Sequence, residues 1–378
     1  MNGIGNPAAG KKKLSMMPTD IYREISKDII GQDGVLRFVS VAIFKHVLGE
    51  KFGNLLMIGN SGTGKTSIMQ SMERMYNRLP FFEKHRVVVR LNANTLADED
   101  EGVVKGRRLF RLLDEKARSV IGTGEVTAEK IREYMEHATV CIDEIDKITS
   151  RVGDKANVLG IAIQQSLLTI MEGEEMLYDT HVMKNGELKP VTIPINTAGI
   201  LFICGGAFEA LYDQVYSRVF REGKQDKLTK MVMDDDRNVH FVQIFTLRDN
   251  LQQEDLFIYG MQPQFLSRFD NAVVLNDLTA DNLETIFTEP ENSVVKTSQR
   301  FFKNYNVVLE ITGRAKRLIA LEAAKHSRVG ARALKEVFGR VIKPFEFDPF
   351  SREEVRKHDD GHELLIDEDI VRKALDLK

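Results

Sequence analysis

A short glycine-rich segment constrains this sequence more than any other feature. Residues 59–66 read Gly-Asn-Ser-Gly-Thr-Gly-Lys-Thr and directly follow the apolar run Leu-Leu-Met-Ile at 55–58. A strand, a glycine loop and a helix that begins at Lys65 form the context in which backbone N–H groups converge on phosphate oxygens. We therefore predict a phosphate-binding loop, in which Lys65 reaches the β and γ phosphates and Thr66 ligates Mg²⁺. The nucleotide-binding residues expected here are Gly59, Ser61, Gly62, Thr63, Gly64, Lys65, Thr66 and Ser67.

A second apolar run ends in two carboxylates. Residues 139–142 read Thr-Val-Cys-Ile and are followed by Asp143 and Glu144. A strand that ends in this way places Asp143 at the carboxyl edge of the sheet, where it can bind nucleotide and hold Mg²⁺. Glu144 is then placed to orient and activate the attacking water. An acidic pair after a strand is common, but after a phosphate-binding loop it indicates nucleotide hydrolysis.

Further apolar runs occur through the first 280 residues, separated by helical stretches. They lie at 87–91, 200–204 and 272–275, and helical periodicity marks stretches such as 109–120 and 163–171. Continuous apolar strands that alternate with helices are typical of a parallel sheet covered by helices on both faces. The predicted fold class is therefore α/β, with a phosphate-loop nucleotide-binding core.

The chain of 378 residues is long enough for two domains. We expect a flexible tail over 1–17, a large α/β domain over 18–278 and a smaller, mainly helical domain over 279–378. Between 208 and 263 the periodicity loosens around the charged segments 224–227 and 234–237, which predicts a long insertion or mobile loop.

Composition narrows the class of protein further. A net charge of −3 gives no electrostatic argument for binding nucleic acid or a membrane. The two cysteines, Cys141 and Cys204, stand inside apolar runs, where a buried thiol is expected rather than a redox or metal site. Neither a signal peptide nor an apolar run near the ~20 residues of a membrane span is visible, so we expect a cytosolic protein.

Hydrolysis also needs positive charge near the developing transition state. Two arginines are candidates: Arg268, which ends the segment Pro-Gln-Phe-Leu-Ser-Arg, and Arg332, which follows Gly330 and Ala331. A lone arginine is usually a surface charge, so the interpretation of this pair depends on the sequence around it.

That sequence resembles the AAA+ superfamily, and within it the ClpX unfoldases, from about residue 18 to residue 376. The segments that carry the resemblance are Asp-Ile-Ile-Gly-Gln at 28–32, Ile-Asp-Glu-Ile-Asp-Lys-Ile at 142–148, Gln-Gln-Ser-Leu-Leu at 164–168, Ile-Met-Glu-Gly at 170–173 and Ile-Leu-Phe-Ile-Cys-Gly-Gly-Ala-Phe at 200–208. The resemblance implies an AAA+ core with a small helical lid, ATP and Mg²⁺ as substrate and cofactor, and a protein client.

The same resemblance assigns roles to particular residues. It implies that Ile29 and Ile30 pack around the adenine and that Arg332 is a nucleotide sensor on the small domain. Arg268 is implied to be the arginine presented to the ATP of a neighbouring subunit. An arginine supplied in this way requires a neighbouring subunit and so implies a ring, for which a hexamer is expected, although another ring size or a filament stays open.

The departures from the family concern what the motor acts on. ClpX grips polypeptide with a Gly-Tyr-Val-Gly loop, but residues 101–106 here read Glu-Gly-Val-Val-Lys-Gly, with Val103 in place of the tyrosine. An Arg-Lys-His loop is not recognisable between 176 and 190, nor is the protease-docking Ile-Gly-Phe between 220 and 245. No cysteine pair at metal spacing is present, so the zinc-binding domain is not expected in this sequence.

Three functions remain open at this point. The preferred hypothesis is a ClpX-like ATPase that remodels, unfolds or disassembles a protein partner without a ClpP-type peptidase. The second is a diverged unfoldase that feeds such a peptidase, and the third is an assembly or structural protein switched by ATP. A nucleic-acid motor is disfavoured by the acidic pI near 6.3.

Overall fold

The computed structural model describes residues 16–50, 53–96, 106–153, 155–184, 187–233, 239–243, 245–326, 328–350, 352–358 and 361–377. The helices in this part of the chain are α1 (Pro18–Ser26), α2 (Asp33–Val47), α3 (Lys65–Arg78), α4 (Arg107–Ile121), α5 (Ala128–Glu136), α6 (Val158–Met171), α7 (Glu209–Arg221), α8 (Leu247–Asn250), α9 (Gln253–Tyr259), α10 (Pro263–Leu266), α11 (Ala280–Thr288), α12 (Val294–Lys303), α13 (Gly313–Ala324), α14 (Arg332–Phe347) and α15 (Glu368–Leu375). None of these helices is both long and apolar enough to cross a membrane.

The strands form one large sheet and several small ones. They are β1 (Leu55–Ile58), β2 (Val88–Asn92), β3 (Thr139–Asp143), β4 (Arg151–Val152), β5 (Lys155–Ala156), β6 (Glu175–Lys184), β7 (Glu187–Asn196), β8 (Leu201–Gly206), β9 (Thr229–Met233), β10 (Val239–Gln243), β11 (Asn271–Val274), β12 (Val307–Ile311), β13 (Val355–His358) and β14 (Gly361–Ile366). The large sheet has the order β11-β1-β8-β3-β2, and every pairing in it is parallel. The predicted α/β fold class is confirmed, with the strands within a residue or two of the predicted runs.

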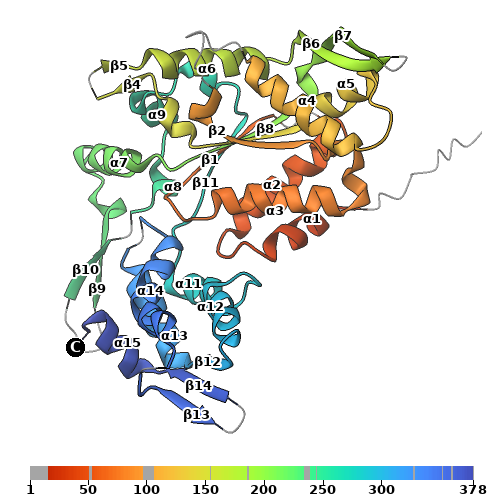
Figure 1. Cartoon of the computed structure of the whole chain (residues 1–378). Coiled ribbons are helices and arrows are strands. Elements are labelled where there is room, and N and C mark those ends of the chain that lie inside the picture. The colour runs from red at the N-terminus through yellow and green to blue at the C-terminus, as the bar shows by residue number, and fades with distance from the viewer. Residues whose placement is uncertain are drawn as a thin grey trace, which may run out of the picture.

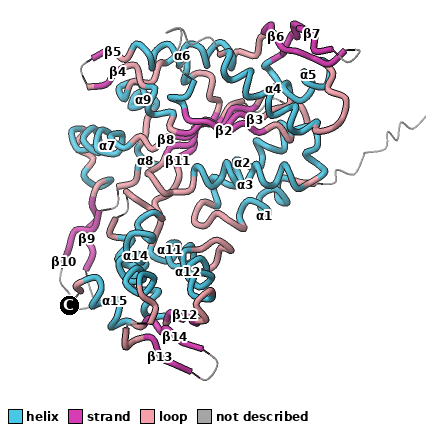
Figure 2. Tube along the Cα trace, in the orientation of Figure 1, coloured by secondary structure: helices cyan, strands magenta, loops and turns pink. Residues whose placement is uncertain are grey.

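Alternate residues of the central strands pack into two separate groups of buried side chains. Leu56 and Ile58 of β1 face one group, which includes residues from α4, α6 and α7, whereas Leu55 and Met57 face a group from α1, α2 and α3. A strand projects successive side chains to opposite faces, so a strand buried on both sides must be apolar throughout. Figure 1 shows helices on both sides of the large sheet, and Figure 2 shows its strands as the layer between these helices.

The two cysteines occupy neighbouring central strands. Cys141 on β3 and Cys204 on β8 are both buried and free. Burial raises the pKa of each thiol, which keeps it protonated and unreactive. This confirms the prediction of buried thiols.

A third group of buried side chains is formed only by residues from Leu278 onward. In this group, side chains of α11, α12, α13, α14 and α15 pack against one face of a small sheet of order β12-β14-β13. The region expected to be mainly helical thus also contains this sheet, because the alternating strand β12 was read as part of the helical region. We keep the division after residue 278 as a proposal, supported by this separation of the buried groups.

The region between 208 and 263 is more regular than predicted. It contains α7, the paired strands β9 and β10, and helices α8 and α9, so the prediction of a mobile loop is wrong for most of it, whereas the alternative of a long insertion stays a prediction. The sequence of α7 does carry a helical pattern, because the apolar residues Leu211, Val215 and Val219 repeat every four residues, and all three are buried. The acidic segment 234–237 lies outside the described residues, as do residues 1–15 of the predicted tail. Met16, at the end of that tail, is buried with Ile21 and Ile25.

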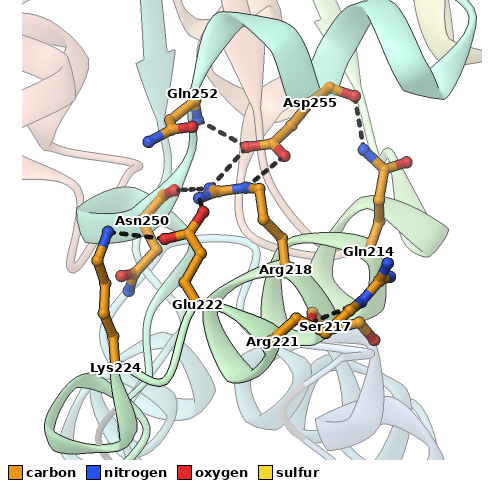
Figure 3. Close-up of polar contacts among 9 residues, drawn as sticks. All are labelled: Gln214, Ser217, Arg218, Arg221, Glu222, Lys224, Asn250, Gln252 and Asp255. Carbon is orange, nitrogen blue, oxygen red and sulfur yellow. Dashed lines mark hydrogen bonds and ion pairs between the residues drawn. The ribbon is translucent and has the colours of Figure 1, made fainter.

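An ion pair with a buried carboxylate fastens α7 to α9 (Figure 3). Arg218 donates through Nε and Nη2 to the two oxygens of Asp255, at 2.8 and 2.9 Å, and also to the carbonyl of Asn250 at 2.6 Å. Asp255 is fully buried and also accepts from the backbone N–H of Gln252, so it caps α9. Glu222 completes the arrangement by accepting from Arg218 at 2.9 Å. Because one carboxylate meets several donors here, α7 and α9 are held as one unit.

Arg218→Ala is expected to destabilise the protein by about 3 kcal/mol, because the Asp255 carboxylate would stay buried without its cation. Urea unfolding at pH 7 measures this loss. Arg221→Ala is the matched control on the same helix: Arg221 is exposed, and its Nε donates to the carbonyl of Ser217 at 3.3 Å. Its expected effect is under about 0.5 kcal/mol. Equal destabilisation by both variants would contradict the interpretation of the Arg218–Asp255 pair.

Candidate nucleotide-binding site

A cavity of about 370 Å³ lies at the carboxyl edge of the large sheet. Its walls come from both the large sheet region and the helices after residue 278. The lining residues are Asp28, Ile29, Ile30, Ser61, Gly62, Thr63, Gly64, Lys65, Thr66, Ser67, Asp143, Glu144, Asp146, Lys147, Ala207, Glu209, Leu278, Ile286, Ala331, Arg332 and Lys335. The volume is within the range typical of small-molecule sites.

The glycine loop connects β1 to α3 in a conformation that suits few side chains. Gly62 and Gly64 have φ values of +73° and +112°, in the left-handed region. The loop leads into the first turn of a helix of 14 residues, whose N-terminal N–H groups and dipole favour an anion. Seven of the eight loop residues predicted to bind nucleotide line the cavity. Gly59 does not line it, but its carbonyl accepts a hydrogen bond from Lys65.

Lys65 lies against its own loop. Its Nζ donates to the carbonyls of Gly59 and Asn60, at 2.5 and 2.9 Å. Burial lowers the pKa of Lys65 to about 8, against the opposing effect of Asp143 and Asp146, whose charges raise it. The lysine is therefore a buried cation with no carboxylate in direct contact among the described residues. A phosphate group would provide it with an anionic partner.

The carboxylates after β3 stand opposite this loop. Asp143 Oδ2 accepts a hydrogen bond of 2.5 Å from Thr66 Oγ1, and Asp143 Oδ1 accepts from the N–H of Glu144 at 2.9 Å. Glu144 has a φ of +56°, an uncommon value for a residue other than glycine, and its carboxylate is exposed. This conformation directs the backbone away from the strand and leaves the Glu144 carboxylate among the cavity-lining groups.

The segment before α2 is fixed to the glycine loop by a buried glutamine. Gln32 donates to the carbonyls of Thr63 and Asn276, at 3.1 and 2.8 Å, and accepts from the N–H of Asn276. This holds Ile29 and Ile30 at the cavity, where Leu278 and Ile286 add further apolar surface. The cavity thus offers both charged and apolar walls, as a nucleotide requires.

The two candidate arginines are in different places. Arg332, the first residue of α14, lines the cavity. Arg268 does not line it. Its Nη2 donates to Glu172 Oε1 at 2.5 Å, and its carbonyl accepts from Asn54 Nδ2 at 2.9 Å. The structure therefore brings Arg332, but not Arg268, to the phosphate-binding loop of the same chain.

Sequence reasoning missed several cavity residues. Lys335 stands one turn after Arg332, so the helical spacing of three residues could have indicated it. Glu209 and Ala207 follow β8, and the carboxyl ends of parallel strands share one edge, so their position was also available in principle. Asp146 was quoted within a motif but given no role. Its Oδ1 accepts from the N–H of Ala207 at 3.1 Å, which links the segments after β3 and β8.

Comparison with known families decides the class of protein. The family model for the AAA domain (Cdc48 subfamily) matches residues 50–272. The chain belongs to this family. It is a ClpX-like AAA+ ATPase, similar along most of its length to proteins named ATP-dependent Clp protease ATP-binding subunit ClpX.

Three such relatives illustrate the similarity. The protein of Bacteroides fragilis is 26% identical over 368 residues, which cover 92% of this chain and 81% of the relative. The protein of Azotobacter vinelandii is 28% identical over 375 residues, with 92% and 79% covered. The protein of Borrelia duttonii is 29% identical over 372 residues, with 93% and 79% covered. The resemblance to the AAA+ superfamily and to ClpX is confirmed.

Nucleotide binding to this AAA+ chain at pH 8.5 is expected to take up roughly half a proton or more. With a pKa near 8, Lys65 is largely neutral at that pH, and the bound phosphates would favour its charged form. Calorimetry with ADP in two buffers that differ in protonation enthalpy measures the uptake. The uptake should shrink at pH 7.5, where most Lys65 is already charged. Its absence at pH 8.5 would contradict the lowered pKa.

Proposed function

We propose that this AAA+ chain couples ATP hydrolysis to the remodelling of a protein client in an oligomeric ring, without a ClpP-type peptidase. The observation that carries the proposal is the meeting of Lys65, Asp143, Glu144 and Arg332 at one cavity. The first three side chains follow two strands of the large sheet, and Arg332 comes from the region after residue 278. A cavity built from both regions allows the state of the nucleotide to influence how the two regions are placed.

The residues of the cavity have distinct roles in the proposed reaction. Backbone N–H groups of the glycine loop and Lys65 bind the phosphates, and Arg332, from the region after residue 278, stabilises their negative charge. Glu144 accepts a proton from the attacking water and orients it toward the γ-phosphate. The P–O bond to the β-phosphate breaks, so ADP and inorganic phosphate are the products.

The donor set also fits Mg²⁺. Thr66 and Asp143 already lie within hydrogen-bond distance of each other, so one hydroxyl and one carboxylate oxygen are available together. Magnesium prefers such oxygen ligands and usually takes the rest from water and the phosphates of the nucleotide. When bound, it would neutralise charge on the phosphates during transfer.

The position of Arg268 is an argument for the proposed ring. It lies outside the lining of its own cavity and is partly exposed, with 37% of its side chain accessible. In the proposed ring it faces the ATP of the adjacent subunit, where an arginine supplied in this way is typically worth ~10³–10⁵ in turnover. A hexamer is the ring size we propose.

The absence of a peptidase partner is proposed from the sequence. The relatives are named as subunits of an ATP-dependent protease. In this chain, the stretch 220–245 contains no Ile-Gly-Phe, and its described residues include the hairpin of β9 and β10. Val103, which stands where a tyrosine is expected in the client-gripping loop, lies outside the described residues. These differences favour a dedicated client over general protein degradation.

Glu144→Gln and Arg268→Ala are each expected to lower ATP turnover by at least ~100-fold, with ADP affinity changed less than about threefold. Mixing the two inactive proteins should restore part of the activity. In a mixed ring, the intact cavity of an Arg268→Ala subunit can receive Arg268 from a Glu144→Gln neighbour. Steady-state phosphate release measures both effects, with Arg221→Ala as the control. No recovery on mixing would contradict the action of Arg268 on a neighbouring subunit.

The Glu144→Gln ring with ATP is expected to retain the client that the wild type releases on hydrolysis. Affinity capture with each protein, followed by identification of the retained chains, measures this. Co-sedimentation with a ClpP-type peptidase should show no ATP-dependent complex, and a stable complex would overturn the peptidase-free part of the proposal. A wild-type ring that binds ATP with negligible turnover would instead favour an ATP-switched assembly protein.

A further inference from the structure

The loop between α13 and α14 lies directly on the phosphate-binding loop. The N–H of Ala331 donates to the carbonyl of Gly62 at 3.1 Å. A Cβ atom at Gly62 would stand 2.3 Å from the carbonyl oxygen of Val329, and one at Gly330 would stand 2.8 Å from the carbonyl carbon and oxygen of Gly62. The two backbones therefore meet at a distance that only glycine permits. Arg332 begins α14 immediately after this contact, so the docking of the loop decides where Arg332 lies.

A second contact, outside the cavity, holds the same loop. Arg328 donates through both terminal nitrogens to the carboxylate of Asp213 on α7, at 2.6 and 3.2 Å. The Arg328 guanidinium also lies over the ring of Tyr212, 5.2 Å from its centroid. A bidentate pair combined with a cation–π contact fixes the direction of the side chain as well as its distance. Both partners come from α7, whereas Arg328 comes from the region after residue 278.

Helix α7 is a firm support for this contact. Its first residue, Glu209, lines the nucleotide cavity. Its later part is fastened to α9 by Arg218, which pairs with the buried carboxylate of Asp255 (Figure 3). Asp213 therefore lies between the cavity and a buried anchor on the same helix. A side chain bonded to Asp213 is positioned relative to the cavity itself.

We propose that Arg328, Asp213 and Tyr212 form a clamp that positions Arg332 for the nucleotide. The clamp is defined by these three side chains and acts by keeping the loop docked on Gly62. None of the three lines the cavity, so they are positioning residues that act through Arg332. The inference rests on the ATPase site proposed above. It adds that these three side chains help to set the affinity of that site for nucleotide.

The exposure of the clamp sets the size of its effect. The Arg328 and Asp213 side chains are 59% and 62% accessible, so water and salt weaken their attraction. When only part of a population is docked, apparent affinity falls in proportion to the docked fraction. Loss of the clamp should therefore weaken ADP binding roughly three- to tenfold. Turnover at saturating ATP should change little, because bound nucleotide itself favours the docked position.

Charge exchange in the full-length protein tests the clamp. Arg328→Asp and Asp213→Arg should each weaken ADP binding, and the double variant should recover most of it, since the pair is restored with reversed charges. The measurements are ADP dissociation constants by calorimetry at 50 mM and 500 mM NaCl, together with KM and kcat for ATP. High salt should weaken ADP binding to the wild type more than to the single variants. The expected pattern is a raised KM with nearly unchanged kcat.

A distance measurement separates positioning from a general structural effect. Spin labels at Glu129→Cys on α5 and Arg314→Cys on α13, both exposed, report on the large region and on the region after residue 278. They should show a broader distance distribution in the single variants and a narrow one in the charge-exchanged double variant. Arg300→Ala is the matched control, because Arg300 is similarly exposed and pairs with Glu291 in its own region. It should change neither readout.

Several outcomes would overturn the clamp. They are unchanged ADP affinity in both single variants, weakened affinity that the double variant does not recover, or an unchanged distance distribution. ADP binding needs neither a client nor a ring partner. A failed client-capture experiment would therefore count against the proposed remodelling function and leave this inference standing.

Discussion

The parallel alignment of the five central strands is the constraint on which the site depends. Because β1, β3 and β8 run in the same direction and lie side by side in the order β1-β8-β3, the segments that follow them emerge at one edge. The glycine loop, the Asp143–Glu144 pair and Ala207 therefore meet, although they are far apart in the sequence. Burial of both faces stabilises this alignment, and it also explains why the central strands β1 and β8 carry no charged side chain.

Features whose chemistry is local were predictable from the sequence. The glycine loop, the carboxylates after β3 and the buried cysteines each follow from a few adjacent residues and the strand that precedes them. The long hairpin of β6 and β7 and the strand β12 were not recognised. Their alternation is interrupted by exposed apolar residues, such as Leu177 and Val308, which make the period ambiguous. Lys335 and Glu209 were missed although Lys335 lies one helical turn after Arg332 and Glu209 follows the carboxyl end of β8.

The ion pairs that join α7 to Asp255 and to Arg328 differ in character. Arg218 meets a fully buried carboxylate that has several donors, so the arrangement has little freedom to change. Arg328 meets Asp213 in solvent, where water competes with the pair and the contact can be made or lost at little cost. One helix thus combines a fixed attachment within the large region with an adjustable attachment to the small one. This difference suits the proposed coupling, in which the nucleotide influences how the two regions are placed while each region stays folded.

Lys65 adds a consequence for how tightly a nucleotide is held. Its ammonium group donates to the carbonyls of Gly59 and Asn60 on its own loop, which takes two of its three N–H donors. A phosphate oxygen can take the third donor, so the loop and the phosphate share one ammonium group. Sharing lowers the affinity for any nucleotide, and a weaker hold on a spent nucleotide favours repeated cycles over tight storage of the product.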